Sequence, residues 1–230
     1  MTGKLYGVGV GPGDPELVTL KALRLTKEAD ILAFPGENPR ESVAYKIMKG
    51  AYPEIDTKQM ISLPMPMTKD KEQLKQVHDE GTRIIADQLD QGKNVVFLTL
   101  GDPTVYSTYL YVHKRVAHMG YDTEIVSGIT SFCAVSARFN QGLVEKAQQL
   151  HVIPASYQIE EALKLPGTKV LMKTGKQMKA VKEQIKASGS EAMMIQNCGM
   201  PDEQIYRTVD EIPEDAGYYS LIIVKEEKKP

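Results

Sequence analysis

The sequence contains few of the residues that build metal centres and disulfide frameworks. Its two cysteines, Cys133 and Cys198, lie far apart and in no Cys-x-x-Cys spacing, so neither a disulfide framework nor a zinc site is expected. The histidines are dispersed in the same way, and they are His78, His113, His118 and His151. We therefore expect no protein-bound metal ion.

Long hydrophobic runs and a strong charge of one sign are also missing. No apolar run approaches the roughly 20 residues that a membrane-spanning helix needs, and the chain enters a strand pattern without an apolar signal core. The sequence therefore favours a cytoplasmic protein. The 28 Lys and Arg residues nearly balance 30 Asp and Glu residues and are scattered along the chain, so nucleic acid is not an expected partner.

A central segment, residues 95–108, predicts a buried strand followed by a tight turn. Residues 95–100 form a continuous apolar run that is typical of a parallel strand buried on both faces. Gly101 and Pro103 break this run, and residues 104–119 then predict a helix. In open α/β folds, the carboxyl ends of the parallel strands are where ligands bind.

Two more polar turns follow predicted strands. Residues 7–15 carry alternating glycines, but Asp14 stands where the third glycine of the dinucleotide-binding pattern G-x-G-x-x-G belongs. An acidic residue at a helix start repels a pyrophosphate, so the loop fits a neutral or cationic ligand such as a sulfonium cofactor better. The other turn is residues 127–131. We expect the three turns to converge on one pocket.

The sequence predicts an α/β protein of two domains, residues 1–127 and 128–230, with a cleft between them. The first has a parallel sheet and holds the cofactor loops and a substrate trough, and the second has a mixed sheet and completes the cofactor site. Predicted strands are 4–10, 30–34, 59–63, 95–100, 123–126, 149–153, 168–172, 190–196 and 218–224. Predicted helices are 15–29, 42–49, 70–89, 104–119, 130–138, 157–164 and 175–187. The polar stretch 197–216 is more typical of a hairpin region than of a βαβ crossover.

An ordered series of motifs resembles one known family. The series is Gly-Val-Gly-Val-Gly-Pro-Gly-Asp (7–14), Gly-Asp-Pro-Thr-Val-Tyr (101–106), Ser-Gly-Ile-Thr-Ser (127–131), Val-Leu-Met (170–172) and Ile-Gln-Asn-Cys-Gly-Met-Pro-Asp-Glu-Gln (195–204). It resembles the tetrapyrrole (corrin/porphyrin) methylases, which use S-adenosyl-L-methionine and release S-adenosyl-L-homocysteine. Within that superfamily it looks most like the precorrin-2 or cobalt-precorrin-2 C(20)-methyltransferases of cobalamin biosynthesis. Ser127 departs from the family's usual proline before the third turn.

The resemblance implies a set of cofactor contacts, which are Pro12, Leu100, Gly101, Asp102, Val105, Thr130, Ser131, Met172 and Cys198. Cys198 replaces a more usual small residue, and a packed small hydrophobe is its alternative role. Asp102 has an alternative role too, which is to cap its own loop. Tyr106 is the candidate catalytic residue, a polar group facing the substrate, with the alternative that it only packs on the domain interface.

The resemblance also implies a tetrapyrrole substrate and a homodimer. Arg40, Lys69 and Arg138 could bind the carboxylates of the substrate. The apolar segment 64–67 could form a wall of the substrate site, or it could simply pack under neighbouring residues. Alternatives stay open: another ring-position methylase, a diphthine synthase, a ribosomal-RNA 2′-O-methylase, or a tetrapyrrole carrier without catalysis. The balanced charge speaks against the RNA enzyme, because RNA binding requires a concentrated basic surface.

Overall fold

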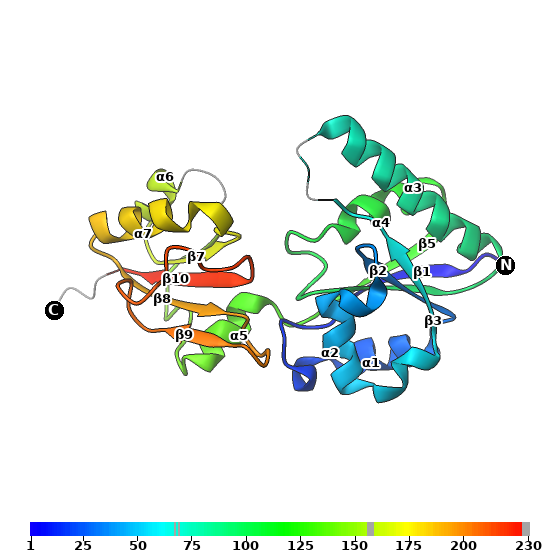
Figure 1. Cartoon of the computed structure of the whole chain (residues 1–230), viewed down its shortest axis with the longest axis horizontal. Coiled ribbons are helices and arrows are strands. Elements are labelled where there is room, and N and C mark those ends of the chain that lie inside the picture. Colours follow the sequence, from blue (N-terminus) through cyan, green and yellow to red (C-terminus); the bar gives the residue numbers. More distant parts are fainter. Residues whose placement is uncertain (67, 69, 156–158, 227–230) are drawn as a thin grey trace. The chain divides into compact units, whose positions relative to one another are not determined.

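The computed structural model describes residues 1–66, 68, 70–155 and 159–226 of the chain (Figure 1). The chain divides into two compact units, Met1–Thr130 and Ser131–Pro230. Each unit is built around a five-stranded sheet covered by helices. The division falls after Thr130, where the sequence predicted a boundary after residue 127.

The first unit contains a parallel sheet with the strand order β3-β2-β4-β1-β5. Its strands are β1 (Lys4–Gly9), β2 (Ile31–Pro35), β3 (Gln59–Leu63), β4 (Val95–Thr99) and β5 (Asp122–Val126). Every residue of β4 is buried, because this strand has a neighbour on each side and helices on both faces. The apolar run at residues 95–100 therefore predicted the central strand correctly.

Two helices cover each face of this sheet (Figure 1). The helices of the first unit are α1 (Leu20–Glu28), α2 (Val43–Ala51), α3 (Lys71–Asp90) and α4 (Tyr109–His118), with short 3₁₀ helices η1 (Pro15–Leu17), η2 (Pro39–Glu41) and η3 (Pro53–Thr57). Leu25 of α1 and Met48 of α2 pack on one face, whereas Ile85 of α3 and Val112 of α4 pack on the other.

This arrangement creates a topological switch point between β1 and β4. The chain leaves β1 toward β2 through α1 on one face, and it leaves β4 toward β5 through α4 on the opposite face. Loops that diverge in this way open a crevice at the carboxyl ends of neighbouring parallel strands, where doubly wound folds bind ligands. The turns at residues 9–15 and 100–108 both lie at this point.

The second unit contains a mixed sheet with the strand order β6-β7-β10-β8-β9, in which only β6 and β7 are parallel. Its strands are β6 (Leu150–Pro154), β7 (Thr168–Met172), β8 (Glu191–Gln196), β9 (Gln204–Tyr206) and β10 (Ser220–Lys225). Its helices are α5 (Ser131–Arg138), α6 (Glu160–Leu163) and α7 (Met178–Ala187), with the 3₁₀ helix η4 (Gly175–Gln177). The short strand β9 pairs with β8 as a hairpin, within the region where the sequence predicted one.

The helices of the second unit divide between the two faces of its sheet. Leu163 of α6 and Ile185 of α7 pack on one face, and Val135 of α5 packs on the other. None of the helices in the described part of the chain has the length and apolar character required to cross a membrane. Met67, Lys69 and the first part of the predicted helix 157–164 lie outside the described residues.

The helix predicted over residues 15–29 is shorter than expected. Asp14 does act as a cap, because its side chain accepts a hydrogen bond from Glu16 N, but it caps only the 3₁₀ helix η1. The α-helix starts at Leu20, where the Thr19 side chain accepts from Ala22 N. The caps at Asp14 and Thr19 thus divide into η1 and α1 the segment that the hydrophobic pattern predicted to be one helix.

Candidate cofactor-binding site

The turns after β1 and β4 are joined directly through their backbones. Gly11 N donates to Gly101 O at 3.3 Å, and Gly101 N donates to Gly11 O at 2.8 Å. Both glycines have positive φ, 79° for Gly11 and 69° for Gly101, a conformation that L side chains rarely adopt. The pairing of β1 with β4 therefore continues beyond the strands as an antiparallel bridge between the two loops.

The turn after β5 packs against the same two loops. A Cβ atom added to Gly9 would lie 2.4 Å from Gly101 O and 2.7 Å from Gly128 N. Contacts this short leave no room for a side chain, so the three backbones lie directly against one another. The prediction that the three turns come together is thus confirmed, and except for Ser131, which starts the second unit, their residues belong to the first unit.

Asp102 connects two of these turns. Its Oδ1 accepts hydrogen bonds from Thr104 N at 2.7 Å and Thr104 Oγ1 at 2.5 Å, and its Oδ2 accepts one from Gly128 N at 3.0 Å. The side chain is 8% exposed. The carboxylate therefore performs the capping role that the sequence left open, and it also fixes the third turn beside the second.

A polar atom without a partner lies in the third turn. The Oγ1 atom of Thr130 is buried and, among the described residues, has no hydrogen-bond partner. A buried hydroxyl left without a partner costs free energy unless a ligand or water binds it. The cradle of close-packed backbone around Gly9 is filled by the protein itself, so the hydroxyl of Thr130 is the group in these turns that suits a polar ligand atom.

The other predicted contacts of the first unit surround this cradle. Pro12 is buried beside Gly11, Leu100 and Val105 are partly buried, and Leu100 packs against the cluster under α1 and α2. The structure therefore places Pro12, Leu100, Gly101, Asp102, Val105 and Thr130 on or beside the three converging turns.

Tyr106 does not lie one turn into a helix, and that prediction was wrong. Helix α4 begins at Tyr109, and Tyr106 lies in the preceding turn with φ 52° and 44% exposure. The turn persists because Asp102 holds Thr104, while the Ser107 hydroxyl accepts from Tyr109 N at 3.2 Å. The side chain projects from a loop beside Val105 rather than from a helix.

The predicted contacts of the second unit lie at the ends of its central strands. Met172 ends β7, Cys198 follows β8, and both pack against the cluster that α5 covers. Burial raises the pKa of the Glu203 carboxyl, but hydrogen bonds from Gly199 N, Arg138 and Cys198 outweigh it and lower the pKa overall. Glu203 thereby organises the loop that carries Cys198. Ser131 begins α5.

Sequence analysis missed one residue near Met172. Thr174 is 1% exposed, and its Oγ1 is a second buried hydroxyl with no partner among the residues that the structure describes. It follows Lys173, which has φ 58°. The sequence pattern that could have indicated Thr174 is a threonine next to a glycine, Gly175, shortly after a predicted strand. None of the motifs that resemble the family includes this threonine.

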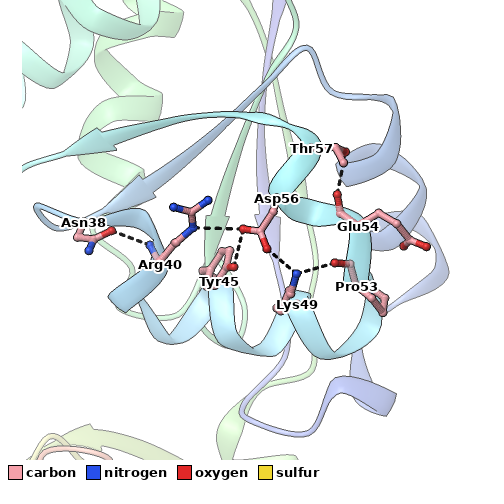
Figure 2. Close-up of polar contacts among 8 residues, drawn as sticks. All are labelled: Asn38, Arg40, Tyr45, Lys49, Pro53, Glu54, Asp56 and Thr57. Carbon is pink, nitrogen blue, oxygen red and sulfur yellow. Dashed lines mark hydrogen bonds and ion pairs between the residues drawn. The ribbon is translucent and has the colours of Figure 1, made fainter.

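Two of the three basic residues that were predicted to bind the substrate carboxylates already form ion pairs with acidic side chains. Figure 2 shows Arg40 Nε donating to Asp56 at 3.2 Å, while Lys49 Nζ donates to the other oxygen of Asp56 at 2.5 Å. Hydrogen bonds from Lys49, Tyr45 and Arg40 lower the pKa of Asp56 to about 2. The second of these residues, Arg138, forms an ion pair with Glu203, with Arg138 Nε and Glu203 Oε1 2.7 Å apart.

Known proteins match nearly the whole of this chain. The family model of the tetrapyrrole (corrin/porphyrin) methylases matches residues 4–213. The chain is 36% identical to a probable cobalt-precorrin-2 C(20)-methyltransferase of Methanocaldococcus jannaschii, covering 98% of this chain and 97% of that protein. It is 32% identical to the cobalt-precorrin-2 C(20)-methyltransferase of Salmonella typhimurium, covering 99% and 98% of the two chains.

Solved structures share the fold. The uroporphyrin-III C-methyltransferase of Thermus thermophilus, in a complex with S-adenyl homocysteine, aligns with a TM-score of 0.70 at 21% identity over 97% of this chain and 98% of that one. The family match extends from β1 past the Cys198 loop and includes all three converging turns. By the length of that match and by its similarity to near full-length relatives, this chain belongs to the tetrapyrrole (corrin/porphyrin) methylase family.

Proposed function

We propose that this chain is an S-adenosylmethionine-dependent C-methyltransferase that methylates carbon 20 of precorrin-2, cobalt-precorrin-2 or cobalt-factor II in cobalamin biosynthesis. The observation that carries the proposal is the similarity over nearly the full length, at 36% and 32% identity, to two proteins named for that reaction, the first of them as probable. The converging turns support it as well, because they carry a buried hydroxyl without a partner among the described residues, which suits a ligand with polar groups.

The first unit supplies the best-supported part of the cofactor site. Pro12 would present its backbone carbonyl, since Gly101 N already donates to Gly11 O and Gly101 O accepts from Gly11 N. Thr130 Oγ1 would find the partner that it lacks among the described residues. Asp102 would act mainly by holding the turns in place, because its oxygens already accept three hydrogen bonds. Ser131, Met172 and Cys198 stay predicted contacts of the second unit.

The residues around the turns need only position the reactants. When bound, S-adenosylmethionine supplies a methyl group on a positively charged sulfur. Alignment of two reactants can lower an activation barrier by roughly 7–11 kcal/mol. A rigid set of turns that holds the cofactor would therefore supply catalysis by positioning. Tyr106 could relay the proton that leaves the substrate carbon, with its hydroxyl accepting that proton while it donates its own to solvent water, because its side chain is 44% exposed.

The main rival from another functional class is a tetrapyrrole carrier without catalysis. Isothermal titration with S-adenosylmethionine distinguishes the two, since a carrier has no need for that cofactor. We expect saturable binding, and a lack of binding at millimolar concentrations would refute the methyltransferase proposal.

Product analysis identifies the ring position. Incubation with cofactor and cobalt-factor II should add one methyl mass and shift the absorbance spectrum of the macrocycle, and carbon-labelled NMR should place the methyl group at carbon 20. Methylation at another carbon would favour one of the other precorrin methylases, such as those named for C(11).

We also propose that the enzyme works in the cytoplasm as a homodimer. Ile61 is apolar, only partly buried and lies on β3, an edge strand of the first sheet, so this edge offers contact area for a second copy. Light scattering after gel filtration tests the dimer, and a single species with the mass of one chain would refute it.

A further inference from the structure

The first unit contains a pocket that is separate from the three converging turns. It has a volume of about 390 Å³ and lies between α3, α4 and the two residues Met65 and Pro66, which follow β3. Met65, Leu74 and Tyr111 contribute apolar surface, and Lys71 and Lys75 stand at its edge. Ligand pockets typically have volumes of 300–1,000 Å³, mostly apolar walls and a few placed polar groups.

One wall of the pocket is a stacked pair of flat rings. The rings of His78 and Tyr111 lie 4.6 Å apart and 13° from parallel. His78 is buried, whereas Tyr111 is 52% exposed, so the tyrosine ring is fixed from behind and open in front. A preordered aromatic surface of this kind favours a flat ligand.

The charge at the edge of the pocket is positive. Arg115 is balanced by Asp79, with Nε and Oδ1 3.0 Å apart. Lys71 and Lys75 lie one helical turn apart on α3 and are exposed, and neither side chain has an ion pair or hydrogen-bond partner in the described part of the chain. Two unpaired ammonium groups above an apolar wall complement a flat group that carries carboxylates.

We propose that this pocket binds one carboxylate-bearing pyrrole edge of the substrate, with Lys71 and Lys75 pairing with its carboxylates and Tyr111 stacking on the ring. The proposal rests on the tetrapyrrole substrate of the proposed function. Thr108 also lines the pocket and closes the same loop that begins at Gly101. The pocket and the cofactor turns are therefore connected by a single short segment of chain.

Binding of a carboxylate-rich porphyrin tests this assignment without any methyl transfer. Uroporphyrin I is titrated into the full chain and followed by its fluorescence. We expect the double variant K71Q/K75Q to bind it about tenfold more weakly than the wild type, since two exposed ion pairs together reach about that effect. The matched control is R83Q/K114Q, which removes two exposed positive charges from α3 and α4 outside the pocket lining.

The aromatic wall has its own variants. Tyr111→Leu should weaken uroporphyrin binding several-fold, while Tyr111→Phe keeps the ring and should bind as the wild type does. Affinity for S-adenosylmethionine should be unchanged in all these variants. If K71Q/K75Q and R83Q/K114Q bind uroporphyrin equally well, the proposal is wrong, although intact cofactor binding would leave the proposed function standing.

A second copy of the chain is the other occupant to consider. If K71Q/K75Q and Tyr111→Leu abolish a dimer in light scattering but leave uroporphyrin affinity unchanged, the pocket is a subunit contact and the substrate assignment is overturned. If the wild type does not bind S-adenosylmethionine, the proposed function is refuted instead. Failure of the pocket assignment and failure of the proposed function therefore give different results.

Discussion

Asp102 holds the turn after β4 against the turn after β5, because its Oδ2 accepts a 3.0 Å hydrogen bond from the backbone N of Gly128. The same carboxylate also fixes Thr104 within its own loop. A single buried side chain thus sets the spacing of two of the three backbones that form the candidate cofactor site. The first prediction follows from this contact.

Asp102→Asn should destabilise the protein and weaken cofactor binding. The amide keeps one acceptor oxygen, so either Gly128 N or Thr104 loses its partner, and a buried group left in that way costs about 1–3 kcal/mol. Urea unfolding and titration with S-adenosylmethionine measure the two effects. Asp87→Asn, at an exposed carboxyl on α3, is the matched control and should change neither quantity. Equal behaviour of the two variants would contradict the role of Asp102.

Gly9→Ala should disrupt the cradle itself. The new Cβ would lie 2.4 Å from Gly101 O and 2.7 Å from Gly128 N, and both atoms are backbone that can move only if the turns separate. Overpacking of this kind costs about 1–3 kcal/mol, and we expect affinity for S-adenosylmethionine to fall at least tenfold. Calorimetric titration tests this, and an affinity within twofold of the wild type would show that the close approach is dispensable.

Gly81→Ala should have the opposite effect on stability. Gly81 lies inside α3, and an added Cβ would meet only Leu63 carbons at 3.8 and 3.9 Å, which is ordinary van der Waals contact. Alanine in a helix interior is more favourable than glycine by about 0.5–1 kcal/mol. The midpoint of urea unfolding should rise accordingly, with cofactor affinity unchanged. A lower midpoint would mean that α3 packs more tightly against β3 than these distances indicate.

Tyr106→Phe tests the catalytic role of the tyrosine. If the hydroxyl accepts or relays the proton that leaves the substrate carbon, turnover should fall at least tenfold, because general base catalysis contributes about 10²–10⁴-fold. Steady-state kinetics with cobalt-factor II gives the answer, and turnover within twofold of the wild type removes the hydroxyl from the mechanism.

Asp56 should make the stability of the first unit depend on acid pH. The Lys49, Tyr45 and Arg40 side chains lower its pKa from 3.8 to about 2 in the folded protein. A depressed carboxyl pKa stabilises the fold above the unfolded value, and that contribution is lost as pH falls toward about 2. The stability gap between the wild type and Asp56→Asn should therefore narrow between about pH 4 and pH 2.

Urea unfolding at several pH values measures that gap. Asp87→Asn is again the control, since Asp87 is exposed on α3, whereas the ion pairs in Figure 2 join residues of η2, α2 and η3. A gap that stays constant across this range would show that the contacts of Asp56 contribute nothing to the pH dependence of folding.

Local patterns predicted the strands well and the turns less well. Residues 59–63 and 168–172 coincide with β3 and β7 as observed, because a short apolar run between breakers has few other ways to be buried. The start of α4 was placed too early. Val105 fits a helical stripe with Tyr109, Val112 and Val116, but the bonds of Asp102 to Thr104 and Gly128 favour a turn instead. Such competition depends on Gly128, which is distant in sequence, and periodicity cannot detect it.

The candidate site shows the same division. Glycines and a proline after three strands predicted where the turns lie, because parallel strands end at one edge of their sheet. The direct contact of Gly9 with Gly128 and the unpartnered hydroxyl of Thr130 could not be predicted, since both depend on how closely the turns approach. The pocket beside Tyr111 also escaped sequence analysis, because it requires α3 and α4 to be packed together first.

The bridge between Gly11 and Gly101 has a consequence for engineering this fold. Because these loops share hydrogen bonds, the backbone conformation of each depends on the other, so exchanging only one of them with a related enzyme would leave mismatched backbone where they meet. A chimera made to alter substrate choice should therefore transplant residues 7–14, 101–107 and 127–131 together. New specificity is more safely sought on the outward side of α3 and α4, where single side chains can change without disturbing that bridge.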